Sequence, residues 1–490
     1  MNARLIKETR VLLPMFVGTL PLIVALTFIE SSGDLGYIAL GVACVVMAGT
    51  SFGAEFQHRT LPLLLSQPIA RSVLWREKVL VLAAGLVASL AALMVCLGIS
   101  RSAISGLNWL ALALIPLCAF CGAPFWTLSL RNGFIGMVST VAVPCGMLAV
   151  YALVTELFGL NEPVVLGTAV VLLLVMYCAR VYWLGYARFQ RLEDVEIPAR
   201  ELRLPAGVEA LFTRPVSKAS SRFRGPFASL LKKEFRLQQV CFLLASVFLL
   251  VAAAGCSLAR RYPEVAAGTV GGDLFLYALI LPLFAGAASV AEERGWGVAE
   301  WHLTLPPSTL KQWSAKLLAA LSTSFVLGLL LPTAVFLAAD PLFSRPDPRP
   351  PFPPAFAILA WVLGQMLLTS LAIYAASCAR TTMQALISSL VMLVAAGGIL
   401  FVALRCVNHS TIAPVQWLGQ PRLDQWLILP LLSAALILLL CLFHSLAWSN
   451  FRHFSPRIPT LMRQFVTIPV AVWLIGWFYF SALLHLSGGF

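Results

Sequence analysis

Charged residues are scarce in this chain and are missing from the places where many carriers need them. Only 11% of the 490 residues are charged and 60% are hydrophobic, whereas about a quarter of a soluble protein is charged. No Asp, Glu, Lys or Arg stands in the middle of a long apolar stretch; Glu156 and Asp273 lie at ends, and His444 and His485 lie near an edge. Proton- and sodium-driven carriers usually use buried ionisable groups, so this absence argues against that class of transporter.

The patterns of nucleotide binding and of hydrolytic catalysis are also missing. A phosphate-binding loop needs Gly-Lys followed by Ser or Thr, and none of the seven lysines follows a glycine. Neither a His-Glu-x-x-His nor a Gly-x-Ser-x-Gly pattern occurs, and no polar segment is long enough for an ATPase domain. We therefore expect that the chain is not an enzyme and carries no cofactor.

The eleven cysteines predict neither a disulfide framework nor a metal site. Ten lie in or beside apolar stretches, and only Cys406 falls in a predicted outer loop. Cys118 and Cys121 have C-x-x-C spacing, but their stretch offers no other residue of a type that binds metal. A buried free cysteine behaves as a small hydrophobic residue, which is the role we expect here.

What dominates the chain is a series of thirteen apolar stretches, each of about the 20 residues that cross a hydrocarbon core. They predict an all-α polytopic membrane protein. The stretches run over residues 11–29, 36–53, 79–98, 108–129, 133–155, 163–184, 237–258, 274–291, 314–339, 354–377, 382–404, 425–448 and 465–486.

Lysine and arginine set the expected orientation, because the inner loops of membrane proteins are enriched in them. With the N-terminus in the cytoplasm and every stretch crossing, only seven of the 34 basic residues lie outside. We therefore expect a cytoplasmic N-terminus. The membrane is expected to be a bacterial inner (plasma) membrane. The net charge of +13 then reflects topology and contact with anionic lipids, and the dispersed basic residues do not indicate nucleic-acid binding.

A polar element of the first half recurs in the second half at one fixed offset and without a gap. Each copy follows the second apolar stretch of its half and leads into the third. Such self-similarity is typical of fused copies of one membrane unit, and an even number of spans in each half predicts two parallel six-span repeats. The matched pairs are Glu55 with Glu293, Pro68 with Pro306, Trp75 with Trp313 and Lys78 with Lys316.

The repeat divides the sequence into four parts. We expect the first six-span half over residues 1–187 and the second over 229–450. A cytoplasmic linker rich in proline and charge, 188–228, joins them. The C-terminal segment 451–490 carries the thirteenth stretch, which we expect to be an extra span.

The repeated element predicts a short helix at the membrane surface. In the first copy Leu61, Leu64 and Leu65 share one helical face, and the helix should end before Pro68 because proline cannot continue it. Glu55 and Glu293 are expected at the starts of such helices, where a carboxylate accepts free backbone amides. An amphipathic interfacial helix would fit this pattern, but the carboxylate and the proline in register favour a docking element for a partner.

These residues resemble the permease subunits of ATP-binding-cassette exporters of the ABC-2 type. The family's short helix between its second and third spans is similar to Glu-x-x-x-Gly-Thr-x-Glu-x-Leu-Leu-x-x-Pro, followed by a basic residue and a later Lys. The first copy departs from this pattern at Arg59 and Pro62, and the second is closer to it. The segment that opens each half also resembles the family's first cytoplasmic helix. The first copy keeps Glu55, Thr60, Leu64, Leu65, Pro68, Arg71 and Lys78, the second keeps Glu293, Gly297, Glu300, Leu303, Pro306 and Lys316, and the opening segments contain Lys7, Glu8, Arg10, Lys233, Glu234 and Arg236.

The resemblance implies an export permease whose two halves form a translocation path. Two copies of a separate cytoplasmic P-loop ATPase would dock through loops 54–71 and 292–309, and ATP-driven closure of those subunits would rock the halves. Two alternatives stay open: a membrane scaffold or assembly factor that transports nothing, and a secondary carrier. The cargo is not identified, although spans with Ser, Thr, Gly and aromatic residues but no charged pocket slightly favour an amphipathic or lipid-like molecule.

Cysteines introduced at Ser220 and Ser344 test the expected orientation. In a background without Cys406, Ser344→Cys should react with a membrane-impermeant thiol reagent on intact cells, and Ser220→Cys should react only after permeabilisation. The measurement is labelling of the purified chain before and after opening of the cells. Labelling of both variants from outside would contradict the orientation.

Overall fold

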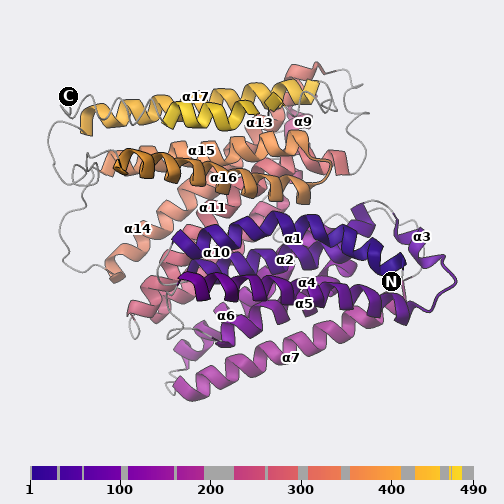
Figure 1. The fold of residues 1–490 in the computed structure, drawn as a ribbon. Coiled ribbons are helices and arrows are strands. Elements are labelled where there is room, and N and C mark those ends of the chain that lie inside the picture. The colour runs from indigo at the N-terminus through magenta and orange to yellow at the C-terminus, as the bar shows by residue number, and fades with distance from the viewer. Residues whose placement is uncertain are drawn as a thin grey trace. The chain divides into compact units, whose positions relative to one another are not determined.

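The structure is a computed structural model in which every described element is helical. No strand occurs in the part of the chain that is described. Among the described residues, eleven helices are long and apolar enough to cross a membrane, so the predicted all-α polytopic membrane fold is confirmed (Figure 1). The described residues are 3–29, 34–57, 60–100, 109–158, 163–192, 226–259, 263–295, 307–343, 354–409, 425–452, 463–464 and 466–476.

The chain divides into two compact units. The packing assigns α10 (Gln239–Leu258), the first long apolar helix of the second half, to the first unit, where it lies against α6 (Gly133–Leu157). The predicted linker 188–228 lies outside the described residues except at its two ends. Unit 1 comprises Met1–Lys232, Gln239–Tyr277 and Val335–Phe343, and unit 2 comprises Lys233–Gln238, Ala278–Ala334 and Ser344–Phe490.

Unit 1 is built around α2, which packs against α1, α4, α5 and α6. Helix α7 lies against α5 on the flank of this unit (Figure 1). The helices of unit 1 are α1 (Ala3–Ile29), α2 (Asp34–Gln57), α3 (Leu61–Leu65), α4 (Arg71–Ser100), α5 (Trp109–Leu130), α6 (Gly133–Leu157), α7 (Pro163–Gln190) and α10 (Gln239–Leu258), while α9 (Pro226–Leu237) and α11 (Pro263–Gly295) contribute residues to both units.

Two residues join α5 to α6 and make these helices run antiparallel. Arg131 has a positive φ of 52°, which ends α5. Asn132 then caps α6, because its Oδ1 accepts hydrogen bonds from the backbone N of Phe134 at 2.9 Å and of Ile135 at 3.3 Å. A side chain at this position satisfies amides that the first turn of a helix leaves unpaired.

Helices α2 and α6 approach closely because their glycines face each other. A Cβ atom added to Gly53 would lie 2.7 Å from Gly133 Cα, and one added to Gly49 would lie 3.0 Å from Met137 Cβ. Gly49 and Gly53 have the small-x-x-x-small spacing that lets membrane helices touch backbone to backbone. Since lipid provides little hydrophobic drive for helix association, this steric fit helps to decide which helices associate.

In unit 2, α15 packs against α13, α16 and α17. One turn of π-helix joins α13 to α14. Pro332 follows this turn and has no amide hydrogen to donate to Gly328, so the regular helical pattern cannot continue there. The remaining helices of unit 2 are α13 (Thr309–Phe325), η2 (Val326–Leu330), α15 (Pro354–Cys378), α16 (Thr382–His409) and α17 (Gln425–Arg452), while α14 (Leu331–Phe343) begins in unit 2 and belongs to unit 1 from Val335 on.

Two of the thirteen predicted stretches are represented by shorter apolar helical segments in the described residues, Thr382–Gly397 and Val466–Gly476. Gln464 anchors the second of these to unit 2. Its Nε2 donates to Asn450 Oδ1 at 2.9 Å, and its Oε1 accepts from the Tyr374 hydroxyl at 3.1 Å. Residues 477–490 lie outside the described part of the chain, so a full crossing by 465–486 stays a prediction.

The contact between α2 and α6 predicts a steric test. Gly53→Val and Gly133→Val should each lower the melting temperature of the purified chain in detergent, because overpacking typically costs about 1–3 kcal/mol. Gly98→Val on α4 is the matched control, since no heavy atom outside its own helix lies within 4 Å of a Cβ added there. Equal melting temperatures for all three variants would show that α2 and α6 do not depend on this contact.

Candidate functional site

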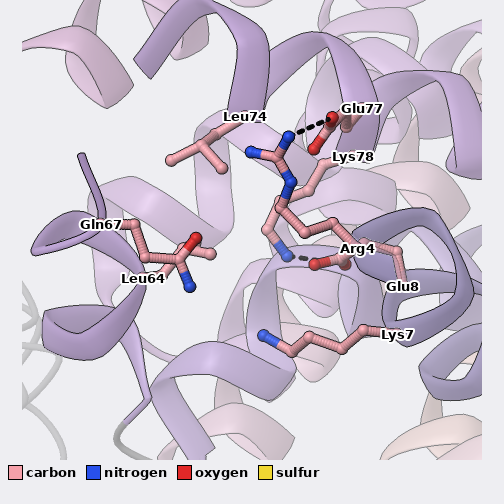
Figure 2. Close-up of a pocket in the computed structure, with 8 residues that line it drawn as sticks. All are labelled: Arg4, Lys7, Glu8, Leu64, Gln67, Leu74, Glu77 and Lys78. Atoms are coloured by element: carbon pink, nitrogen blue, oxygen red, sulfur yellow. Dashed lines mark hydrogen bonds and ion pairs between the residues drawn. The ribbon is translucent and has the colours of Figure 1, made fainter. Parts of the chain in front are cut away.

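A buried lysine joins three helices at one end of unit 1. Lys78 Nζ on α4 donates to Glu8 Oε2 on α1 at 2.8 Å and to Glu55 Oε1 on α2 at 3.1 Å. It also donates to the backbone oxygen of Ser51 at 3.3 Å. An ammonium group has three protons to donate, so all three have partners inside the protein. Figure 2 shows Lys78 reaching Glu8 across this site. We call Lys7, Glu8, Glu55 and Lys78 the first cluster.

Glu55 links the first cluster to the loop that follows α2. Its Oε1 also accepts from Lys7 Nζ at 3.1 Å, and its Oε2 accepts from the hydroxyl of Thr60. The backbone N of Thr60 donates to the backbone oxygen of Glu55 at 3.0 Å. The start of the loop is therefore held by one carboxylate that is buried in the helix bundle.

The predicted short helix before Pro68 is present as α3. It begins directly after Thr60, whose backbone oxygen accepts from the backbone N of Leu64 at 2.9 Å. Leu64 faces inward and is 5% exposed, whereas Leu63 is 69% exposed. The outward apolar position of this helix is thus Leu63, which the face expected from the sequence did not include.

Unit 2 contains the same arrangement of charges. Lys316 Nζ on α13 donates to Glu234 Oε1 on α9 at 3.0 Å and lies 2.8 Å from Glu293 Oε2 on α11. It also donates to the backbone oxygen of Ser289 at 3.0 Å. Lys233 Nζ donates to Glu293 Oε1. We call Lys233, Glu234, Glu293 and Lys316 the second cluster.

The two clusters use corresponding positions of the sequence. Each of the three hydrogen bonds that Lys78 makes has a counterpart at Lys316, including the one to a serine carbonyl one turn before the helical glutamate. This correspondence supports the interpretation that the halves are copies of one unit. Ser51, Glu55 and Lys78 match Ser289, Glu293 and Lys316 at the offset of the repeat, and Lys7 and Glu8 match Lys233 and Glu234 at a slightly shorter offset.

An aromatic group beside each cluster follows the same correspondence. The ring of Trp75 lies 5.8 Å from Tyr186 and 5.4 Å from Phe189. The ring of Trp313 lies 5.8 Å from Trp448 and 5.2 Å from Phe451. Trp75 matches Trp313 at the offset of the repeat. Tyr186 matches Trp448 and Phe189 matches Phe451 at a single, longer offset. The last helix of each half therefore packs on the tryptophan one turn before the buried lysine.

Burial makes each lysine depend on both of its carboxylates. The side chains of Lys78 and Lys316 are 3% and 4% exposed, and a buried charge is costly unless it is paired and hydrogen-bonded. Burial raises the pKa of Glu234, while the neighbouring Lys316 ammonium opposes this shift. Each cluster therefore holds its own three helices together only while its lysine and both carboxylates are present.

A small cavity opens beside the first cluster, lined by Arg4, Lys7, Glu8, Leu64, Gln67, Leu74, Glu77 and Lys78 (Figure 2). Arg4 pairs with Glu77 at 3.3 Å across it. Its volume of about 20 Å³ suits roughly one water molecule, whereas sites for small ligands measure about 300–1,000 Å³. This cavity is too small to hold cargo, so the arrangement around it serves to connect helices.

The structure brings some predicted site residues together and leaves others apart. Lys7, Glu8, Glu55, Thr60 and Lys78 form one connected group, and Lys233, Glu234, Glu293 and Lys316 form the other. Arg71 Nη1 instead donates to the backbone oxygen of Gln190 on α7 at 2.6 Å. Arg10, Arg236 and Pro68 are exposed, Leu65 is half-buried, and Gly297, Glu300, Leu303 and Pro306 lie outside the described residues.

The expected capping role of Glu55 and Glu293 is wrong. Glu55 lies in the last turn of α2 and Glu293 in the last turn of α11, and neither begins a short helix. Both helices continue beyond their apolar stretches because the buried lysines neutralise these carboxylates. Removing Glu55 or Glu293 therefore leaves a buried lysine short of a partner, which is a larger disturbance than the loss of a helix cap.

Three features of unit 2 were not predicted. Arg294 donates to the backbone oxygens of Ser377 and Ala379 at the end of α15, and Gln238 Nε2 donates to the backbone oxygen of Ala285 at 3.0 Å. Glu292, directly before Glu293, is also buried. The run Glu292-Glu293-Arg294 at the end of an apolar stretch was the available signal for Glu292 and Arg294, and the sequence offered none for Gln238.

Comparison of the chain with protein-family models, with curated proteins and with solved structures gave no match. The chain is an integral membrane protein on the strength of its apolar helices.

The clusters predict unequal roles for their lysines. Lys316→Met and Lys78→Met should each destabilise the purified chain by about 3–5 kcal/mol, because removing one partner leaves buried charge uncompensated. Lys7→Met is the matched control: its side chain is 48% exposed, and exposed pairs contribute about 0–1 kcal/mol. Thermal unfolding in detergent measures the difference. Equal stabilities for Lys7→Met and Lys78→Met would contradict the central role of the buried lysine.

Proposed function

We propose that the chain is the membrane-spanning permease subunit of an ATP-driven exporter. In this proposal its spans form the translocation path, and two copies of a separate cytoplasmic P-loop ATPase dock through loops 54–71 and 292–309. The observation that carries the proposal is the repeated cluster at the base of each loop. Glu55 and Glu293 each join the end of the second span of a half to the opening segment and to the third span of that half.

The contacts of the first loop suit a device that transmits force. The side chain and backbone of Glu55 both hold Thr60, and α3 follows at once. A partner that displaces α3 therefore acts on Glu55, and through Lys78 on Glu8 and α1. Ion pairs that are buried and fully hydrogen-bonded resist separation, so the helices should move together.

The surface of α3 indicates where a partner would bind. Leu63 is 69% exposed beside Ser66 and Gln67, which are also exposed, whereas Leu64 is buried against the bundle. A docked partner could cover Leu63 without breaking any contact that holds the loop. A scaffold that transports nothing would use the same surface, so the test must measure transport-linked ATP hydrolysis as well as attachment.

The proposal is tested by purification of the tagged chain from its native host. It should bring down a P-loop ATPase in a ratio of two ATPase copies to one chain, and the chain stripped of that partner should hydrolyse no ATP, because it has no phosphate-binding loop. Leu63→Ser should reduce the amount of bound ATPase severalfold without lowering the melting temperature. Leu157→Ser is the control: it is 82% exposed and is expected on the opposite side of the membrane.

Three outcomes would overturn the proposal or narrow it. ATP hydrolysis by the stripped chain would contradict the proposal that a separate subunit hydrolyses ATP. Absence of any ATPase from the purified complex would exclude the proposed ATP-driven exporter. A bound ATPase whose hydrolysis rate is the same with and without the chain would favour the scaffold.

A further inference from the structure

Two helices that run through unit 2 are interrupted near the middle of their spans, and one side chain of α15 contacts both interruptions. In α11, Pro282 has no amide hydrogen to donate to the backbone oxygen of Ala278, four residues before it. Gln365 on α15 supplies the missing donor, since its Nε2 donates to that oxygen at 2.7 Å. Pro282 lies at the centre of the candidate span Val270–Arg294.

The second interruption is the π-turn Val326–Leu330, near the middle of the candidate span Thr309–Ala339. Pro332 cannot donate to the backbone oxygen of Gly328 in this turn. Gln365 packs directly on the turn, because a Cβ atom added to Gly328 would lie 2.8 Å from Gln365 Oε1. The same amide group therefore completes the hydrogen bonding of α11 and fills the space beside the glycine of the π-turn.

One turn further along α15, both helices are held firmly. A Cβ atom added to Gly286 on α11 would lie 2.5 Å from the backbone oxygen of Thr369, so α11 and α15 touch backbone to backbone there. The Thr369 hydroxyl also forms a hydrogen bond with the Ser324 hydroxyl on α13 at 2.8 Å. On the other side of the interruptions, the packing assigns α11 to unit 1 up to Tyr277 and α14 to unit 1 from Val335 on.

A membrane helix bends most easily where its hydrogen-bond ladder is broken, and proline and π-turns are the usual causes. π-turns inside longer helices are also frequent at functional positions. Here each helix is fixed to α15 on one side of its interruption and leaves unit 2 within about two turns on the other side. Bending of either helix is therefore concentrated at the interruption.

We propose that α11 and the helix formed by α13, η2 and α14 are a pair of hinges, at Ala278–Pro282 and at Val326–Leu330, and that Gln365 is the latch of both. The inference rests on the proposed function, in which ATP-driven closure moves the halves, and it names where the spans bend. Bending separates Gln365 Nε2 from the Ala278 oxygen. A carbonyl without a donor is costly inside a membrane, so the latched form is favoured until the ATPase supplies the energy.

Gln365→Leu tests the latch, because leucine keeps most of the side-chain volume and cannot donate a hydrogen bond. Amide hydrogen exchange of the purified chain, measured by mass spectrometry, should become roughly tenfold faster in both 274–281 and 326–333, since opening no longer breaks the Gln365 contacts. Segment 284–291, which contains Gly286, should keep its wild-type rate. Gln384→Leu is the matched control, because the Gln384 side chain is exposed near the start of α16.

Pro282→Ala is the complementary variant, because alanine restores a donor for the Ala278 oxygen. When it is combined with Gln365→Leu, exchange in 274–281 should return to the wild-type rate or below it, whereas exchange in 326–333 should stay fast. Pro282→Ala alone should leave the ATPase attached but lower the stimulation of its hydrolysis by the chain severalfold, since one hinge is stiffened.

Three results would overturn the inference and leave the proposed function intact: unchanged exchange in Gln365→Leu, faster exchange confined to 274–281, or full stimulation of the ATPase by Pro282→Ala. Absence of any attached ATPase would instead count against the proposed function. The exchange measurements on the chain alone do not depend on the ATPase, so the two failures are distinguishable.

Discussion

A lysine buried where a membrane helix ends can keep its charge only if carboxylates surround it, and this constraint organises both units. Lys78 and Lys316 each require a glutamate from the segment that opens the half and another from the end of the second span. The third span supplies the lysine itself. Three segments that lie far apart in sequence must therefore meet at one point. The loop between the second and third spans is fixed at its base as a result.

The sequence was sufficient for the fold class, because the length of an apolar stretch is a local property. The sequence alone did not predict that Glu55 pairs with a buried lysine. An apolar stretch is counted as ended where charge begins, so the pattern places Glu55 in loop 54–71 and Lys78 just outside the third stretch. In the structure α2 runs on to Gln57 and α4 begins at Arg71, because pairing with Glu8 makes the charges compatible with burial. That pairing joins residues 70 positions apart, and no local pattern contains it.

A similar limit hid the aromatic partners of the two tryptophans. Tyr186 and Phe189 match Trp448 and Phe451 at a longer offset than the tryptophans themselves, because segments of different length intervene in the two halves. A search at one fixed offset finds the tryptophans and misses what they pack against. The predicted site residues between 296 and 306 belong to the second copy, which resembles the ABC-2 pattern more closely than the first copy does. They lie outside the described residues, so their contribution stays a prediction from the sequence.

The interior of unit 1 explains why a small loop can matter to long helices. Gly53 meets Gly133 at the start of α6, and Glu55 lies only two residues further along α2. The end of α2 is thus held to α6 by steric fit and to α1 and α4 by ion pairs, within about one turn of helix. The backbone contact is lost within a short separation, and opening the buried ion pairs leaves charges without their hydrogen-bond partners, which is costly. These contacts therefore connect the ends of α1, α2, α4 and α6, and Thr60 attaches α3 directly to them. Under the proposed function, a displacement of α3 is expected to move these helix ends together.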